Sequence, residues 1–281
     1  MSRAYSLIRD QPVYRADAFA SGLKANGFEV VKAAPRGAGP GDVLLIWNRY
    51  FGNHDLACRF EEWGGTVLVA ENAYIWKHGI SPHHLKDRPA YALARSYHND
   101  STVIPDGGPE RWGALGIELN PWQDGEHILV CPNRSFGVPG RIMPADWAES
   151  TCKRLRALTK REVRLRPHPG NDPPTKPLIE DLRGCHTVVI WSSSAGVHAL
   201  VNGVRVVCCS PYWICKQAAS EPRQTDEDWQ RWLRVQYADA SREQALRNLA
   251  HAQFSLQEIA SGFAFASVLR AARKEEVPAG A

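Results

Sequence analysis

Short apolar runs alternate along this chain with longer segments in which apolar residues recur at helical spacing. Runs of this length are typical of buried strands, and the longer segments of the helices that connect them, so the pattern favours parallel sheets. In the first half the predicted strands are Tyr5–Ile8, Phe28–Val31, Val43–Trp47 and Thr66–Ala70, and the predicted helices are Tyr14–Ala25 and His54–Trp63.

The rhythm stops over residues 72–126, where His, Pro, Gly and Asn are frequent. We interpret this stretch as loops around a binding cleft, because it is too long for a plain connector. The rhythm then resumes. The predicted strands are Ile128–Cys131, Val163–Arg166, Val188–Trp191 and Val204–Cys208, and the predicted helices are Ala145–Leu158, Pro177–Leu182, Ala195–Val201 and two C-terminal helices that begin near Trp229.

The predicted fold is therefore α/β, with two Rossmann-like lobes and C-terminal helices. We place the first lobe at residues 1–125, the second at 126–271 and a flexible tail at 272–281. A chain of 281 residues with 44% hydrophobic content is long enough for two cores.

Composition excludes some classes of protein and leaves others open. No segment resembles a membrane span or a secretory signal, which predicts a cytoplasmic protein. Its seven cysteines are odd in number and scattered, as expected for reduced thiols. The net charge of +4 suits either nucleic acid or a small phosphate ligand. Composition predicts no oligomeric state.

Three consecutive serines follow a buried strand in the segment that begins at Val188. Ser192, Ser193 and Ser194 precede a helix that starts with small residues, so hydroxyls and backbone N–H groups meet where the helix dipole is positive. A single serine there would more often be a plain helix cap. Three of them followed by Gly196 favour a phosphate-binding turn.

A second polar cluster, RLRPHPG, leaves the strand that ends near Arg166. Ligands of open α/β sheets bind outside the carboxyl ends of the strands, so Arg166 and His168 are expected near the serines. A cation there would stabilise a leaving phosphate. His168 alone could equally be a structural loop histidine.

These motifs resemble the capsular-polysaccharide glycosyltransferases of the sialyltransferase-like GT-B fold, which include bacterial Kdo transferases. The resemblance covers roughly residues 128–215. The matching residues are Arg166, His168, Pro169, Ser193, Ser194, Gly196, Ala199, Leu200 and Gly203. It implies a GT-B enzyme that binds a nucleotide-sugar, such as a UDP-sugar, in its second lobe. Because the sequence has no metal-ligand set, we expect its chemistry to be metal-independent. His198 stands where the family usually has glutamate, which leaves the donor's identity open.

In the first lobe, the segment TVLVAENAYIW resembles an acidic strand end of the same enzymes. Glu71 is the first candidate for the catalytic base, because an acceptor hydroxyl needs a group that takes its proton. The alternative is a structural glutamate paired with Arg49. His54 and Asp106 are weaker candidates. The predicted acceptor-binding residues are Asn48, Arg49, Asn72, Trp76, Arg111 and Trp112.

No metal or cofactor is predicted. His78, His83, His84 and His98 fall in the irregular stretch, but no carboxylate or cysteine completes a ligand set.

The acceptor remains a choice between two classes. The pattern also resembles proteins of tailed phages, and a net-positive chain without a membrane anchor would suit 5-hydroxymethylpyrimidine in DNA. The arginines and tryptophans proposed to contact DNA are Arg88, Arg95, Arg111, Arg134, Arg141, Trp47, Trp76, Trp112 and Trp122. The other reading is a surface-glycan or capsule glycosyltransferase. A sugar-nucleotide epimerase and a nucleotide- or nucleic-acid-binding protein are the alternatives from other classes.

Overall fold

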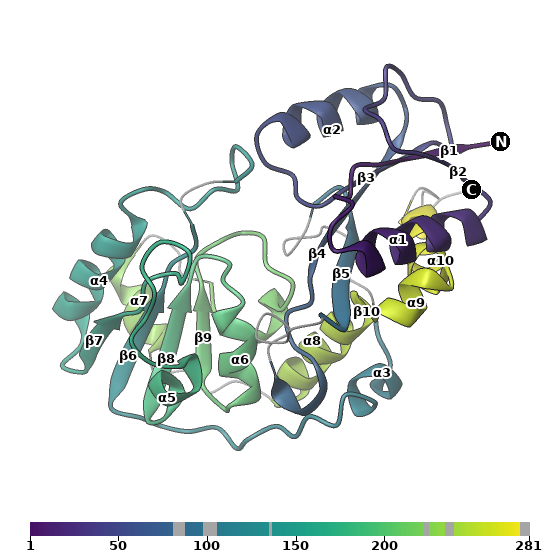
Figure 1. Ribbon diagram of the computed structural model, residues 1–281. Coiled ribbons are helices and arrows are strands. Elements are labelled where there is room, and N and C mark those ends of the chain that lie inside the picture. The colour runs from purple at the N-terminus through teal and green to yellow at the C-terminus, as the bar shows by residue number, and fades with distance from the viewer. Residues whose placement is uncertain (81–87, 98–105, 135–136, 222–224, 234–238, 276–281) are drawn as a thin grey trace, which may run out of the picture. The chain divides into compact units, whose positions relative to one another are not determined.

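The computed structural model describes residues 1–80, 88–97, 106–134, 137–221, 225–233 and 239–275, the last five of these by backbone alone. These residues form two compact units (Figure 1). The first unit contains residues 1–76, 80–106 and 250–281, and the second contains 77–79 and 107–249.

The first unit is built on a six-stranded sheet in the order β10-β5-β4-β3-β1-β2. β1 (Arg3–Ser6), β2 (Glu29–Val31), β3 (Val43–Ile46) and β4 (Thr66–Asn72) run parallel, as the sequence predicts. β5 (Ala90–Arg95) and β10 (Gln253–Ser255) complete it.

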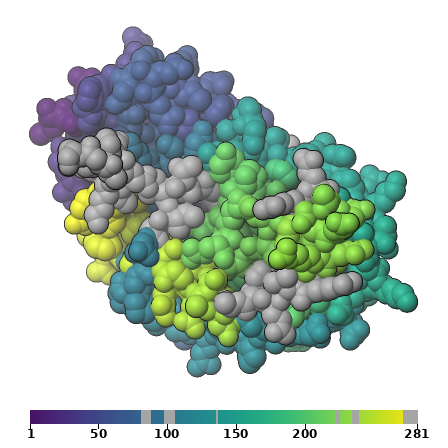
Figure 2. Space-filling model, turned by 180° about the vertical axis from the view of Figure 1, so that it is seen from behind, coloured from purple at the N-terminus to yellow at the C-terminus, as the bar shows by residue number. Residues whose placement is uncertain are grey.

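Helices cover both faces of this sheet. α1 (Val13–Ala25), α9 (Leu256–Ala260) and α10 (Phe263–Glu275) pack on one face around Phe19, Phe254 and Phe265. α2 (Gly52–Glu62) packs on the other face through Ala57 and Phe60. Figure 2 shows the C-terminal residues, in yellow, beside the purple N-terminal residues.

Two features of the first unit differ from the prediction. β5 lies within the stretch interpreted as loops, and it pairs antiparallel with β4, while β10 pairs antiparallel with β5. The expectation of parallel sheets is thus wrong for this edge. β5 has the sequence AYALAR, whose alanines have low strand propensity, so its conformation depends on pairing with neighbours distant in the sequence.

The second unit contains a four-stranded parallel sheet in the order β7-β6-β8-β9. Its strands are β6 (His127–Cys131), β7 (Glu162–Leu165), β8 (Cys185–Ile190) and β9 (Arg205–Cys208). α4 (Trp147–Leu158) and α7 (Asp226–Trp232) bury Trp147 and Trp229 in the core on one face.

The remaining elements of the second unit are helices and short turns. α6 (Ala195–Val201) contacts β8 and β9, and α5 (Leu178–Leu182) packs beside it. The others are α3 (Pro109–Gly113), α8 (Asp239–His251) and the 3₁₀ turns at Lys77–Gly79 and Lys216–Ala218. α6 has the predicted bounds, and the other elements predicted here lie close to theirs.

The boundaries of the units differ from the lobes proposed from the sequence. The first unit ends at Asp106 rather than near residue 125, and it includes the chain again from Ala250. The physical reason is that β10 joins the first sheet and α9 packs against α1.

Candidate functional site

Polar residues follow three neighbouring strands of the second unit at their carboxyl ends. Asn133 follows β6, Arg166 and His168 follow β7, and Ser192 follows β8. Because β6, β7 and β8 are parallel, these residues lie at the same edge of the sheet. This is the edge at which open α/β sheets bind their ligands.

Asn133 links two of these strand ends. Its Oδ1 accepts a hydrogen bond from the Ser192 backbone N–H at 3.0 Å, and its Nδ2 donates to Ser192 Oγ at 3.3 Å. The sequence analysis missed Asn133, although the segment CPNR follows a predicted strand just as RLRPHPG does. The two bonds hold the serine turn against the end of β6.

His168 is fixed in one neutral form. The Gly170 N–H donates to His168 Nδ1 at 2.9 Å, so the ring proton resides on Nε2. Burial lowers the pKa of His168 below its usual 6.5, and the positive charge of Arg134 lowers it further. Near neutral pH, His168 is therefore an uncharged donor through Nε2–H, the form that binds a phosphate oxygen without a change of protonation.

Arg134 lies against the same loop. A Cβ atom on Gly170 would be 2.0 Å from Arg134 Nη2, so the guanidinium packs directly against this glycine. Arg134 is exposed, whereas the Arg166 side chain is mostly buried and forms an ion pair with Asp181. Lys176 lies 3.5 Å from the same carboxylate. Of these two guanidinium groups, that of Arg134 is the more exposed.

The residues of the serine turn have different local roles. Ser193 Oγ accepts a hydrogen bond from the Ala195 N–H at 3.3 Å, and all three serines are half-buried. Gly196 is buried where a Cβ would come within 2.7 Å of both Ile190 and Trp213, which is a packing reason for glycine. His198 is half-buried within α6.

In the first unit, Glu71 and Asn72 end β4 and are half-buried. The Tyr74 hydroxyl donates a hydrogen bond to Glu71 Oε1, and Arg88 Nη1 donates to Asn72 Oδ1 at 2.7 Å. Arg88 is a further residue that sequence reasoning did not assign to this strand end. Recognising the strand β5 in the sequence would have placed Arg88 at this strand end, because β5 pairs with β4.

Arg49 has a different environment from the one predicted. It is 1% exposed, and its two Nη atoms donate to the Glu61 carboxylate at 2.9 and 2.6 Å. Its partner is thus Glu61, and not Glu71 as in the alternative considered for the sequence. An arginine so enclosed holds α2 to the end of β3 and is not presented to an acceptor.

The other predicted residues of the acceptor side are dispersed. His54 lies in the first turn of α2, where its Nδ1 accepts from Arg49 Nε at 3.4 Å. The Asn48 carbonyl accepts from Asn53 Nδ2 at 3.1 Å, and Trp76 is half-buried. Asp106 is exposed at the end of the first unit. Arg111 and Trp112 belong to α3 in the second unit.

Within the described ranges, no group of three His, Cys, Asp or Glu side chains gathers as a metal site would require. His83, His84 and His98 lie outside the described residues. None of the described helices has both the length and the apolar character needed to cross a membrane.

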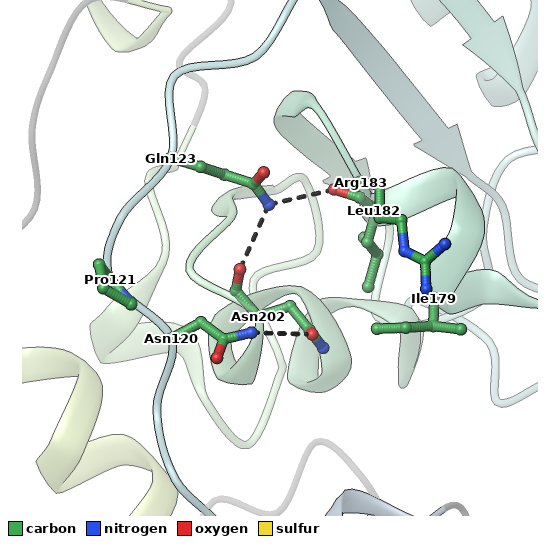
Figure 3. A pocket seen from close by; sticks show the side chains of 7 residues that line it. All are labelled: Asn120, Pro121, Gln123, Ile179, Leu182, Arg183 and Asn202. Atoms are coloured by element: carbon green, nitrogen blue, oxygen red, sulfur yellow. Dashed lines mark hydrogen bonds between the residues drawn. The ribbon is translucent and has the colours of Figure 1, made fainter.

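A cavity of about 380 Å³ lies at the opposite edge of the second sheet (Figure 3). Gln123 Nε2 donates there to the carbonyls of Leu182 and Asn202, at the C-terminal ends of α5 and α6. The cavity is thus remote from the strand ends that carry His168 and Ser192, and we assign no function to it.

Comparison with known proteins identifies the fold. No family model and no curated protein matches this sequence. Among solved structures, KpsC β-Kdo 2,4-transferase of Thermosulfurimonas dismutans superposes with a TM-score of 0.55 at 13% identity, covering 87% of this chain and 89% of that chain. KpsC β-Kdo 2,7-transferase of the same organism has a TM-score of 0.55 at 11% identity, covering 95% and 99%.

This chain shares the fold of these two transferases. The resemblance predicted from its motifs is thus confirmed at the level of the fold, and at these identities no further. The phage branch of that prediction has no support among these structures.

Proposed function

We propose that this protein is a glycosyltransferase of the GT-B type that moves a sugar from a nucleotide-sugar donor to a hydroxyl acceptor. The observation that carries the proposal is the group formed by Asn133, Arg134, His168 and the serine turn at the carboxyl edge of the second sheet. It combines a positive charge with neutral N–H and O–H donors, which is the chemistry that binds a diphosphate. The fold shared with two transferases supports it.

In this proposal each residue has a defined task. Arg134 and His168 Nε2–H contact the phosphates and stabilise the charge that develops when the nucleotide leaves. Asn133 positions the serine turn. This arrangement needs no metal ion, because fixed N–H donors and a guanidinium neutralise the leaving phosphate. In the first unit, Glu71 takes the proton of the acceptor hydroxyl.

The finer proposal for the acceptor is 5-hydroxymethylpyrimidine in DNA, and it rests on the sequence. Several groups that were to contact DNA have partners inside the protein. Arg88 donates to Asn72, and the guanidinium of Arg141 lies 3.8 Å from the Tyr212 ring centroid. The Trp122 ring is covered by the guanidinium of Arg242, which lies 4.3 Å from the ring centroid. These contacts reduce the basic aromatic surface available to a duplex, so a surface glycan is tested beside DNA.

A titration tests the donor site. Isothermal calorimetry with UDP should show that His168→Ala and Ser193→Ala each weaken nucleotide binding by about tenfold or more, as expected for lost charge-assisted hydrogen bonds. Arg164→Gln is a matched control, since Arg164 is partly exposed and paired with Glu162 at 2.6 Å. Unchanged affinity in both variants would place the phosphates elsewhere.

A transfer assay tests the reaction and separates the acceptor classes. A panel of nucleotide-sugars is incubated with hydroxymethylated DNA, unmodified DNA and oligosaccharides, and the products are weighed by mass spectrometry. A sugar-sized mass gain on any acceptor supports the proposal, and the acceptor that gains it identifies the class. Conversion of the donor without an acceptor indicates an epimerase, and nucleotide binding without turnover indicates a binding protein.

A further inference from the structure

Four arginines are buried in the described part of the chain, and their partners differ. Arg49 pairs with Glu61, Arg205 lies 3.4 Å from Asp124, and Arg242 lies 3.2 Å from Asp239. The fourth, Arg15, is 8% exposed and has no carboxylate partner among the described residues. A buried charge without an opposite charge is costly, which makes Arg15 the exception that needs a reason.

Within the described residues, the contacts of Arg15 are all neutral. Its Nη2 donates to the Gln11 carbonyl at 2.7 Å, its guanidinium lies 4.4 Å from the centroid of the Trp47 ring, and its Nε is buried without a hydrogen bond. A carbonyl and an aromatic face stabilise a cation only in part. The described residues therefore leave the positive charge of Arg15 largely uncompensated.

Two further features make the surroundings of Arg15 positive. Arg15 lies in the first turn of α1, a helix of thirteen residues whose first turn contains no acidic side chain. The positive end of the helix dipole is thus unopposed. Arg88 precedes β5 and is half-buried, and no carboxylate of the described ranges forms an ion pair with it. Its contact is the neutral Asn72.

The topology brings these groups to one edge of the first sheet. β1 runs into α1, and Trp47 follows β3, so Arg15 and Trp47 lie at the carboxyl ends of parallel strands. β5 runs the other way, and Tyr91 pairs with Asn72 at its start. The rings of Trp47 and Tyr91 touch edge to face with centroids 5.8 Å apart.

Tyr91 connects the two arginines. Its hydroxyl is buried without a hydrogen bond of ordinary geometry. Burial raises the pKa of Tyr91, with the neighbouring Tyr14 adding to the rise, while the positive charges of Arg15 and Arg88 oppose it. Both guanidinium groups thus act on one protonated hydroxyl, which lies beside Tyr14 and has no hydrogen bond of ordinary geometry among the described residues.

We propose that this edge of the first unit is a binding site for an oxyanion, a carboxylate or a phosphate monoester, held by Arg88, Arg15 and the N-terminus of α1. Arg88 and Tyr14 are half-buried and are the groups that the anion reaches first. Arg15 and Tyr91 lie deeper and supply charge and a hydroxyl donor behind them. Resting on the proposed function, this site selects an acceptor that carries an acidic group.

Binding of simple probes tests the site without donor or turnover. The full-length protein is titrated with methyl glucuronide, inorganic phosphate and uncharged methyl glucoside, with binding followed by NMR. Arg88→Gln and Tyr91→Phe should each weaken binding of the charged probes by about tenfold, the scale for a hydrogen bond to an ion. Methyl glucoside should bind neither the parent nor the two variants. A preference for the glucuronide identifies a carboxylate site, and a preference for phosphate identifies a phosphate site.

Matched controls separate a ligand site from a structural role. Tyr5→Phe removes a hydroxyl on the opposite face of the same sheet, and Arg3→Gln removes an exposed guanidinium. Neither should change binding. Because the Tyr91 hydroxyl has no hydrogen bond of ordinary geometry among the described residues and only Tyr14 beside it, Tyr91→Phe should keep its melting temperature while losing affinity, and Arg15→Gln should also remain folded. If the charged probes bind no better than methyl glucoside, or if the variants bind them as the parent does, the inference is wrong.

Failure of the anion site and failure of the proposed glycosyltransferase function give different results. Anion binding without any sugar transfer would leave this site in place and overturn the glycosyltransferase. Transfer to acceptors that carry no acidic group, at equal rates in the parent and in Arg88→Gln, would support the glycosyltransferase and overturn the anion site.

Discussion

At the scale of single residues, Glu71 bears the most specific chemical assignment. Its side chain is half-buried and accepts a hydrogen bond from Tyr74. Glu71→Gln retains an oxygen for that bond but removes the base, so turnover should fall by about a hundredfold while nucleotide affinity stays unchanged. Transfer kinetics and calorimetry measure the two quantities.

The control for this variant is Glu29→Gln, which changes an exposed glutamate of β2. Should Glu71→Gln turn over within a few-fold of the parent, Glu71 is structural, and His54 and Asp106 are the next bases to test.

His186 provides a prediction for pH. It is 3% exposed, and burial together with Arg161 and Arg205 lowers its pKa from 6.5 to about 4, against the pull of Asp124. Its neutral form is therefore favoured in the folded state. The free energy of unfolding is therefore unaffected by His186 above pH 6.5. It falls by about 3 kcal/mol in total as the pH drops from 6.5 towards 4, because the unfolded state takes up the proton first.

Denaturant unfolding at a series of pH values measures this effect. In His186→Gln the fall in unfolding free energy between pH 6.5 and 4 should be smaller than in the parent, since one titrating group is gone. Equal slopes in the two proteins would show that other groups govern acid stability.

At the scale of elements, the crossing of α1 and α9 depends on Gly22. A Cβ at this position would lie 1.9 Å from the Ile259 carbonyl oxygen, and backbone cannot move aside as a side chain can. Gly22→Ala should therefore lower the unfolding free energy by about 1–3 kcal/mol, in spite of alanine's better helix propensity.

Ser21→Ala is the control, because Ser21 is exposed on the same helix. Thermal or denaturant unfolding should show little loss there. A Gly22→Ala protein as stable as the parent would mean that α1 and α9 can separate at low cost.

At the scale of the whole molecule, the first unit is completed by the C-terminal segment. Phe265 of α10 is fully buried and packs edge to face on Phe19 of α1. Phe265→Ala should lower stability by about 3–5 kcal/mol, because the cavity lies in the core of the first unit. The loss should be smaller for Phe263→Ala, since Phe263 is 45% exposed.

Limited proteolysis can localise the loss. Cleavage in Phe265→Ala should spread first through the first unit, because the second has its own core around Trp147. Equal protection of both units in the variant and the parent would contradict this assignment.

The sequence by itself determined the parallel strands, most of the helices and the strand ends that carry His168, Ser192 and Glu71. These features are local: the apolar period of a segment and the polar residues after it need no distant partner. The same local signals led to the fold that the comparisons support.

Only the tertiary structure decided which polar residues are presented and which are enclosed. Arg166 and Arg49 were predicted to contact ligands, but Asp181 and Glu61, distant in the sequence, pair with them. β5 pairs with β4 and with β10, which lies much later in the chain, and the pairing with β4 places Tyr91 opposite Asn72, the partner of Arg88. Ion pairs and sheet edges join residues far apart in the chain, so no local pattern encodes them.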